Sequence, residues 1–187
     1  MKKLLLLFVM LPLLLSPTQA STKTEVMKAS KQAVLALKSK NMAKLAALVH
    51  PAKGVRFTAY SYVDKKVDLV FKAGQVSGLW KNRKIYNWGA YDGSDEPIKL
   101  RFSKYYAAFI YDRDFANAPQ IEYNTLIGHG NTPANFETVY TKAKFVEYHF
   151  PDSGNGGAID WKSLRLIFEK SGRKWYLVGI CHDEWTI

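Results

Sequence analysis

The chain of 187 residues contains a single cysteine, Cys181. No disulfide can form within a chain that has one thiol, so a small fold held together by disulfides is excluded. Cys181 lies in the apolar run 176–181, and free cysteines are among the most buried residue types. We therefore predict that Cys181 fills the core and is not a nucleophile. Stability must come from buried apolar side chains, for which the 14% aromatic content provides material.

The sequence also lacks the common catalytic and nucleotide-binding motifs. No G-x-S-x-G, H-E-x-x-H or C-x-x-C motif occurs. The glycine-rich stretches 128–131 and 154–157 do not link a predicted strand to a predicted helix, and neither ends in the Lys-Ser/Thr of a phosphate-binding loop. We therefore expect no cofactor and no metal ion. The familiar hydrolase and metalloenzyme classes are disfavoured, although an unfamiliar site is not excluded.

Acidic residues are scarce: 16 Asp and Glu face 27 Lys and Arg, which gives a net charge of +11. Such an excess suits anionic envelope polymers, lipid headgroups or nucleic acid. The basic residues are scattered in short groups, at 65–66, 81–84 and 142–144. We therefore expect a solvated basic surface and no specific nucleic-acid binding.

Long hydrophobic runs are absent except at the N-terminus. Lys2 and Lys3 precede the apolar run 4–15, and small residues follow it up to Ala20. This pattern is typical of a secretory signal peptide, and the run is shorter than the roughly 20 residues that span a bilayer. The sequence predicts cleavage near Ala20–Ser21 and an exported protein, periplasmic or secreted. The mature part, 21–187, is expected to be a single domain without a transmembrane segment.

The first half of the predicted mature part begins with two helices. Apolar residues recur at helical spacing over 24–38, and Asn41 can cap a second helix that ends at His50 before Pro51. Strands are predicted at 54–60 and 84–91, and a short helix capped by Ser103 at 103–111. Residues 112–142 are expected to be irregular.

Three strand-like runs follow, at 143–150, 163–170 and 174–182. A short glycine-containing turn joins the last two, and the loop 151–160 joins the first two. Short links between consecutive strands favour an antiparallel meander. Helices first and a meander last predict an α+β domain of two layers.

Leu45 to Pro51 followed by Gly54 to Phe57, together with Trp175 to Ile180, resembles the NTF2-like superfamily, also called SnoaL-like or cystatin-like. Tyr86 to Gly93 and Asp160 to Phe168 resemble segments of uncharacterised exported bacterial proteins of that fold. The resemblance implies N-terminal helices packed on a curved antiparallel sheet. It brings no agreed catalytic set, and it implies that the protein could form a homodimer through an open sheet face.

Few polar residues are candidates for catalysis. Glu147 and His149 share one strand face, and Arg165 and Glu169 on a neighbouring strand could approach them. The four residues could form an ordinary cross-strand charge network, or Glu147 and His149 could act as a general acid–base pair.

His182 is the third catalytic candidate. Strand alternation places Cys181 and Asp183 on one face and His182 and Glu184 on the other. Only pairs of these residues can therefore converge, which argues against a metal site.

Aromatic residues are the remaining signal for ligand binding. Tyr86 and Trp88 share a strand face and are the best candidates for adjacent pocket walls, and Tyr60 and Arg165 are added as further ligand-binding candidates. The hypothesis is a non-catalytic domain that binds a small molecule, peptide or envelope component between helices and sheet. The alternatives are a small-molecule enzyme that uses His and Asp/Glu in that cavity and a dimeric scaffold.

Overall fold

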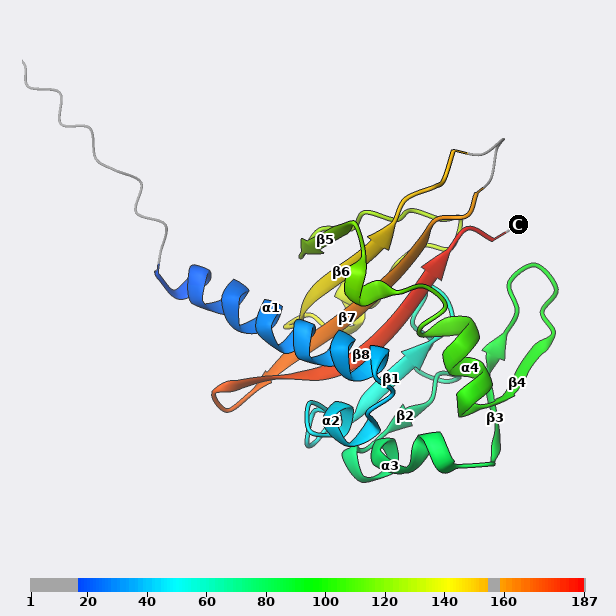
Figure 1. Ribbon diagram of the computed structural model, residues 1–187, viewed down its shortest axis with the longest axis horizontal. Coiled ribbons are helices and arrows are strands. Elements are labelled where there is room, and N and C mark those ends of the chain that lie inside the picture. Colours follow the sequence, from blue (N-terminus) through cyan, green and yellow to red (C-terminus); the bar gives the residue numbers. More distant parts are fainter. Residues whose placement is uncertain (1–16, 155–158, 187) are drawn as a thin grey trace, which may run out of the picture.

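Residues 17–154 and 159–186 are described by a computed structural model, in which a long N-terminal helix crosses a curved sheet (Figure 1). The apolar run of the predicted signal peptide lies outside these residues. In chain order the elements are α1 (Pro17–Lys38), α2 (Met42–Ala46), β1 (Val55–Thr58), β2 (Val70–Phe71), α3 (Ala73–Gly78), η1 (Leu79–Lys81), β3 (Ile85–Ala90), β4 (Pro97–Arg101), α4 (Phe102–Phe109), η2 (Phe115–Asn117), β5 (Gln120–Tyr123), α5 (Phe136–Val139), β6 (Lys144–Phe150), β7 (Lys162–Ser171) and β8 (Lys174–Glu184).

The main sheet has the strand order β2-β1-β8-β7-β6-β5. All neighbours are antiparallel except β1 and β8, which are parallel. A register shift between Ile167 and Phe168 interrupts the pairing of β7 with β8, and bulges of this kind increase the local twist. Strands β3 and β4 form a separate two-stranded sheet.

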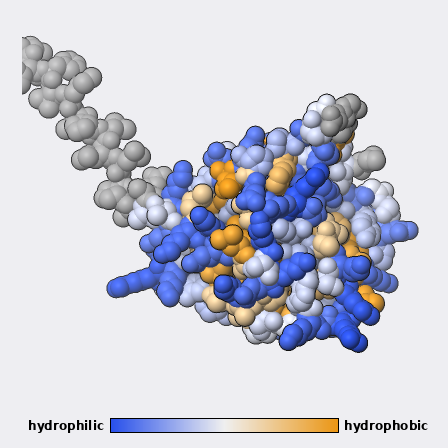
Figure 2. Space-filling model, in the orientation of Figure 1, coloured by the Kyte–Doolittle hydropathy of each residue, from blue (hydrophilic) through white to orange (hydrophobic). Residues whose placement is uncertain are grey.

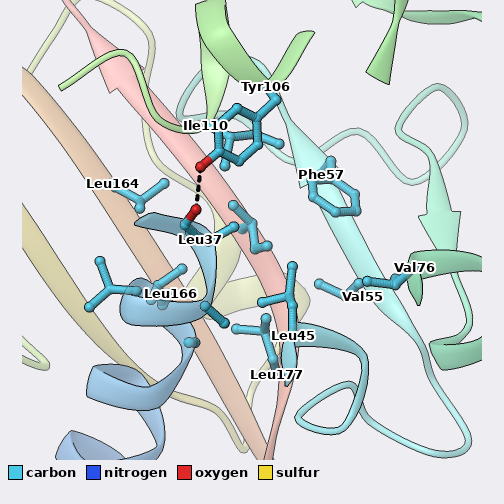
Figure 3. Packing of buried hydrophobic residues seen from close by; sticks show 14 of the residues in the cluster. Leu37, Leu45, Val55, Phe57, Val76, Tyr106, Ile110, Leu164, Leu166 and Leu177 are labelled. Carbon is cyan, nitrogen blue, oxygen red and sulfur yellow. Dashed lines mark hydrogen bonds between the residues drawn. The ribbon is translucent and has the colours of Figure 1, made fainter. Parts of the chain in front are cut away.

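The main core lies between α1 and the sheet. Val26, Ala33, Val34 and Leu37 recur at helical spacing and are buried, so this face of α1 covers the sheet. Figure 3 shows Leu37 beside Leu164, Leu166 and Leu177 of the central strands, and it shows the hydroxyl of Tyr106 donating to the carbonyl of Leu37. The hydrogen bond ties α4 to the end of α1.

The opposite face of the sheet is covered as well. Phe145, Ile167 and Cys181 pack there with Phe136 of α5 and with Val63 from the loop after β1. This second core confirms that Cys181 is a buried, free cysteine. Chain segments from both halves of the protein therefore cover the face that the homodimer hypothesis treated as open.

The α+β architecture expected from the sequence is confirmed: N-terminal helices pack on a curved sheet, and β6, β7 and β8 form the predicted antiparallel meander. Asn41 caps α2 as predicted, because its side chain accepts from the backbone N–H of Lys44 at 3.0 Å.

Other predictions of local structure were wrong. Helix α2 stops at Ala46, because the chain then turns to let Val49 bridge to Leu177 of β8. Helix α4 begins at Phe102 with Arg101 in the cap position, so Ser103 lies inside the helix. The segment 112–142 is not irregular throughout, since it contains η2, β5 and α5. Strand β5 lies at the sheet edge with most of its residues exposed, which removes the alternation that marks a half-buried strand.

Among the described residues, no helix combines the length and the apolar character needed to cross a membrane.

Candidate functional site

A cavity of about 280 Å³ lies between the chain that follows β1 and the β3–β4 hairpin. Its walls carry four aromatic and four acidic side chains, and we call it the aromatic pocket: Tyr60, Tyr62, Trp88, Tyr91, Asp64, Asp68, Asp92 and Asp95. The aromatic rings and the carboxylates come from two chain segments, 59–68 and 88–95, which the fold brings face to face.

Trp88 is fixed more firmly than the other aromatic residues of the pocket. It is 2% exposed, and its ring stacks on Tyr105 of α4 with centroids 3.9 Å apart and planes 10° apart. Its indole N–H donates to the carbonyl of Leu100 in β4 at 2.9 Å. Trp88 therefore forms a rigid wall before any ligand arrives.

Tyr60 joins the two sides of the aromatic pocket. Its hydroxyl accepts a hydrogen bond from the backbone N–H of Asp92, and its ring contacts Phe109 edge-on at 5.7 Å. Burial raises the pKa of Tyr60, so its phenol is neutral at physiological pH. The bond between Tyr60 and Asp92 holds the β3–β4 turn against the chain after β1.

Asp68 is the most perturbed carboxyl of the pocket. Its side chain is 8% exposed, and burial raises its pKa to about 7. The guanidinium of Arg56 lies 3.6 Å away, and the backbone N–H of Asp64 donates to Asp68 at 2.7 Å. These two partners oppose the effect of burial without cancelling it. A carboxyl that titrates near neutral pH beside a cavity is a recognised mark of a functional site.

The predicted ligand-binding residues divide between this pocket and other places. Tyr60 and Trp88 line it. Tyr86 shares the face of Trp88, as predicted, with ring centroids 5.4 Å apart, but its hydroxyl accepts from Asn82 outside the pocket walls. Arg165 lies in a buried network on another part of the sheet.

That ionic network joins Glu147, Arg165 and Asp183 on the three central strands. Arg165 is fully buried, and its guanidinium lies 3.0 Å from Glu147 and 2.7 Å from Asp183. It also donates to the hydroxyl of Ser61 and to the carbonyl of Gly128. All three guanidinium nitrogens are therefore engaged with protein atoms, which leaves Arg165 unavailable to a ligand.

Glu147 is held ionised at the centre of the network. Burial alone would raise its pKa, but Arg165 and hydrogen bonds from Ser163 and from the Gly128 N–H hold the pKa below its ordinary value. In Asp183 the balance is reversed: burial raises the pKa despite the attraction of Arg165. Two buried carboxylates thus share one guanidinium, and Glu147 receives most of the stabilisation.

His149 meets this network through Ser163. The hydroxyl of Ser163 donates to Glu147 at 2.6 Å, so His149 must donate from Nδ1 to the Ser163 oxygen at 2.8 Å. The proton of Ser163 is therefore directed to the carboxylate and not to an imidazole base. Burial lowers the pKa of His149, which keeps the ring neutral at pH 7. Glu147 and His149 do converge, but Glu169 lies apart from them and pairs with Lys53.

His182 points to the opposite face of the sheet, as strand alternation predicts. Its Nδ1 lies 3.2 Å from the Ala59 carbonyl and its Nε2 lies 3.2 Å from Asp112. Lys162 forms ion pairs with both Asp112 and Glu184. His182 and the two carboxylates offer ligand atoms within 4.8 Å of one another, the spacing of a possible metal site. A metal ion would have to displace the Lys162 ammonium, which already neutralises these carboxylates.

Sequence reasoning missed Asp68, Asp112 and the loop at Gly128. Asp68 follows a pair of lysines in a segment without periodicity, so nothing in the sequence indicated that it is buried. The glycine-rich stretch 128–131 matched no nucleotide-binding motif, and nothing in the sequence indicated that Gly128 packs against the buried network. A Cβ at this position would lie 2.5 Å from the Ser163 hydroxyl, which shows that close approach to the network requires glycine.

Comparisons with known proteins find little that is similar. No family model and no curated protein matches the chain. A solved structure titled Rd1NTF2_05, with five substitutions in its name, is similar at a TM-score of 0.37 and 12% identity over 87% of this chain and 98% of that chain. A likeness at this score is too distant to support a function. The α+β fold therefore rests on its own strand order and helix placement.

Proposed function

We propose that the chain is an exported, non-catalytic binding protein of the NTF2-like type that holds a small molecule in the aromatic pocket. The observation that carries the proposal is the rigid wall formed by Trp88 on Tyr105, at a cavity whose other walls are aromatic and acidic. Ligand sites are typically preformed concave surfaces with aromatic walls and a few polar groups, and one of these groups often has a perturbed pKa.

Two structural observations favour binding over the alternatives. The enzyme hypothesis requires His149 or His182 beside a carboxylate in a cavity, and neither histidine lines the aromatic pocket. The scaffold hypothesis requires an open sheet face, and the face away from α1 carries the second core. Binding needs neither feature.

Binding is tested by following the indole N–H resonance of Trp88 in a ¹H–¹⁵N NMR spectrum while small fragments are added. The panel contains benzyl alcohol, benzylammonium and benzoate, which present the same ring with different charge. We expect at least one fragment to shift the resonance of Trp88 and to leave unchanged that of Trp161, which precedes β7 and does not line the pocket. If no fragment shifts Trp88 at millimolar concentration, the proposal is wrong.

Export is proposed from the N-terminal pattern alone and has its own test. Expression of the full chain in a bacterium, followed by fractionation and N-terminal sequencing, should place the product outside the cytoplasm with Ser21 as its first residue. A full-length product confined to the cytoplasm would contradict export without affecting the binding proposal.

A further inference from the structure

The charge of the aromatic pocket is opposite to that of the whole protein. The chain carries a net charge of +11. Within the described part of the chain, the pocket is nevertheless lined by four aspartates and by no Lys, Arg or His. A surrounding basic surface repels free cations in general, so acidic groups concentrated in one hollow provide a local attraction that the rest of the surface does not.

The walls of the aromatic pocket suit a cation that also has apolar surface. Tyr62 and Tyr91 line the pocket and are 51% and 38% exposed as whole residues, so they are accessible to a ligand. Aromatic faces attract ammonium and guanidinium groups through the ring quadrupole, and the attraction grows when the cation is desolvated. A hydrated metal ion gains little from such walls, whereas a methylated or aryl ammonium group gains from both the rings and the carboxylates.

Asp68 forms an ion pair with Arg56, and that pair is long. Arg56 approaches it at 3.6 Å, longer than a charge-assisted hydrogen bond of about 2.7–2.9 Å. The carboxylate is nearly buried at the pocket wall, so its charge is poorly compensated there. A bound cation would supply the missing positive charge.

The second observation concerns Tyr105, the residue on which the Trp88 ring stacks. The hydroxyl of Tyr105 is fully buried and has no hydrogen-bond partner. Tyr105 stacks on Trp88, and Asp68 and Tyr60 of the pocket are close enough to act on its phenol electrostatically. Buried hydroxyls without a partner are uncommon in folded proteins, and this one adjoins the pocket walls.

We propose that the ligand of the aromatic pocket is a small organic cation, in which an ammonium group bound by Asp68 carries an apolar body that packs on Trp88, Tyr62 and Tyr91. This inference rests on the proposed binding function and names its ligand class.

The test compares cations with neutral molecules of the same shape. Choline is paired with 3,3-dimethyl-1-butanol, and benzylammonium is paired with benzyl alcohol. Dissociation constants are measured by NMR titration of the Trp88 indole resonance on the full chain. We expect each cation to bind at least tenfold more tightly than its neutral counterpart.

Asp68→Asn supplies the matched variant, and Asp152→Asn serves as the control because Asp152 is an exposed loop residue that does not line the pocket. The Asp68 variant should reduce cation affinity at least fivefold and leave the neutral molecules unchanged, whereas the control should change neither. The ¹H–¹⁵N spectrum of each variant shows whether the fold is retained.

The pH dependence of the wild-type chain provides a readout that does not need a variant. Cation affinity should be higher at pH 8.5 than at pH 5.5, because Asp68 is ionised at the higher pH. The ionisable groups that act on Asp68 or are acted on by it come from several elements: Arg56 of β1, Asp64 of the same loop, Tyr105 of α4, Tyr140 after α5 and Cys181 of β8.

The outcomes separate the two proposals. Equal binding of cations and neutral molecules at Trp88 would overturn the cation inference and leave the binding function intact. Binding of benzoate alone would do the same. If no probe shifts Trp88, both proposals fall.

Discussion

Arg165 connects three strands of the main sheet and the loop at Gly128. Its guanidinium joins β7 to Glu147 of β6, to Asp183 of β8 and to the loop carbonyl of Gly128. The planar fork of arginine can reach all of these at once, which the single ammonium of lysine cannot. The residue predicted as a ligand contact is therefore the structural centre of the meander.

Replacing Arg165 with methionine should destabilise the protein severely. The change leaves Glu147 and Asp183 buried without their cation, for which a loss of about 3–5 kcal/mol is typical. The control is Lys38→Met, which breaks an ion pair with Asp114 that is exposed on both sides and should cost little stability, as exposed ion pairs generally do. Urea unfolding measures both, and similar losses in the two variants would contradict the structural role of Arg165.

Gly128 and Gly74 offer a matched pair of glycines. In Gly128→Ala the new Cβ would lie 2.5 Å from the Ser163 hydroxyl and 2.6 Å from the Trp161 ring, so the loop must move away from Glu147. We expect a loss of about 1–3 kcal/mol, as for other overpacked positions. Gly74 lies in α3 with open space around it, and Gly74→Ala should stabilise by about 0.5–1 kcal/mol. Thermal unfolding of both variants should move the midpoint in opposite directions.

Among the elements, α1 continues past the predicted cleavage site. The helix begins at Pro17, but the first residue of 21–38 that is buried against the sheet is Val26. Cleavage near Ala20–Ser21 would therefore leave Val26 and the buried residues after it in the chain. An apolar groove lies on each side of α1, and Leu35 is exposed between the two grooves. The rest of the surface in this view is mostly hydrophilic (Figure 2).

A chain that begins at Met27 should be less stable than a chain that begins at Ser21. The shorter chain loses the side chain of Val26, which is fully buried, and burial of such a side chain contributes about 1.5–3 kcal/mol. Urea unfolding of the two chains measures the difference. Equal stability of the two shortened chains would show that the N-terminal turns of α1 do not support the core.

The elements also show which parts of the fold were accessible from sequence. Strands β6, β7 and β8 have long apolar patterns and were predicted to within two residues at each end, whereas helix α1 was predicted only from residue 24 and begins at Pro17. Strands β2 and β5 were missed, because a two-residue strand and an exposed edge strand carry no periodicity. Part of the candidate site could be predicted from the sequence. Tyr60 and Trp88 were identified because they are aromatic, whereas the role of Asp68 depends on its burial in the tertiary structure, which no local sequence pattern indicates.

At the scale of the whole molecule, the ionisation of Asp68 should change the free energy of unfolding as the pH changes. The pKa of Asp68 is about 7 in the folded protein and near 3.8 in the unfolded chain. Between these values the folded state keeps a proton that the unfolded state releases, so this group lowers the stability of the fold as the pH rises from about 4 to about 7.

Asp68→Asn should remove that contribution. The free energy of unfolding of the variant minus that of the wild type should increase from pH 4.5 to pH 8 and then remain constant. The difference isolates Asp68 from Asp183, whose pKa is also raised, and from Glu147 and Asp112, whose pKa values are lowered. Urea unfolding at four pH values measures it, and a difference that does not vary with pH would refute the burial of an ionisable Asp68.

The parallel pairing of β1 with β8 has a consequence for the time course of folding. The first strand of the main sheet cannot complete its pairing until the last strand has left the ribosome, and Ala59 and His182, bonded across this seam, lie 123 positions apart. Contacts so distant in sequence make folding slow, because a long loop must close first. A nascent chain that lacks β8 would thus remain open, and the export proposed from the N-terminal pattern would require such a delay, because a polypeptide crosses a translocation channel before it folds.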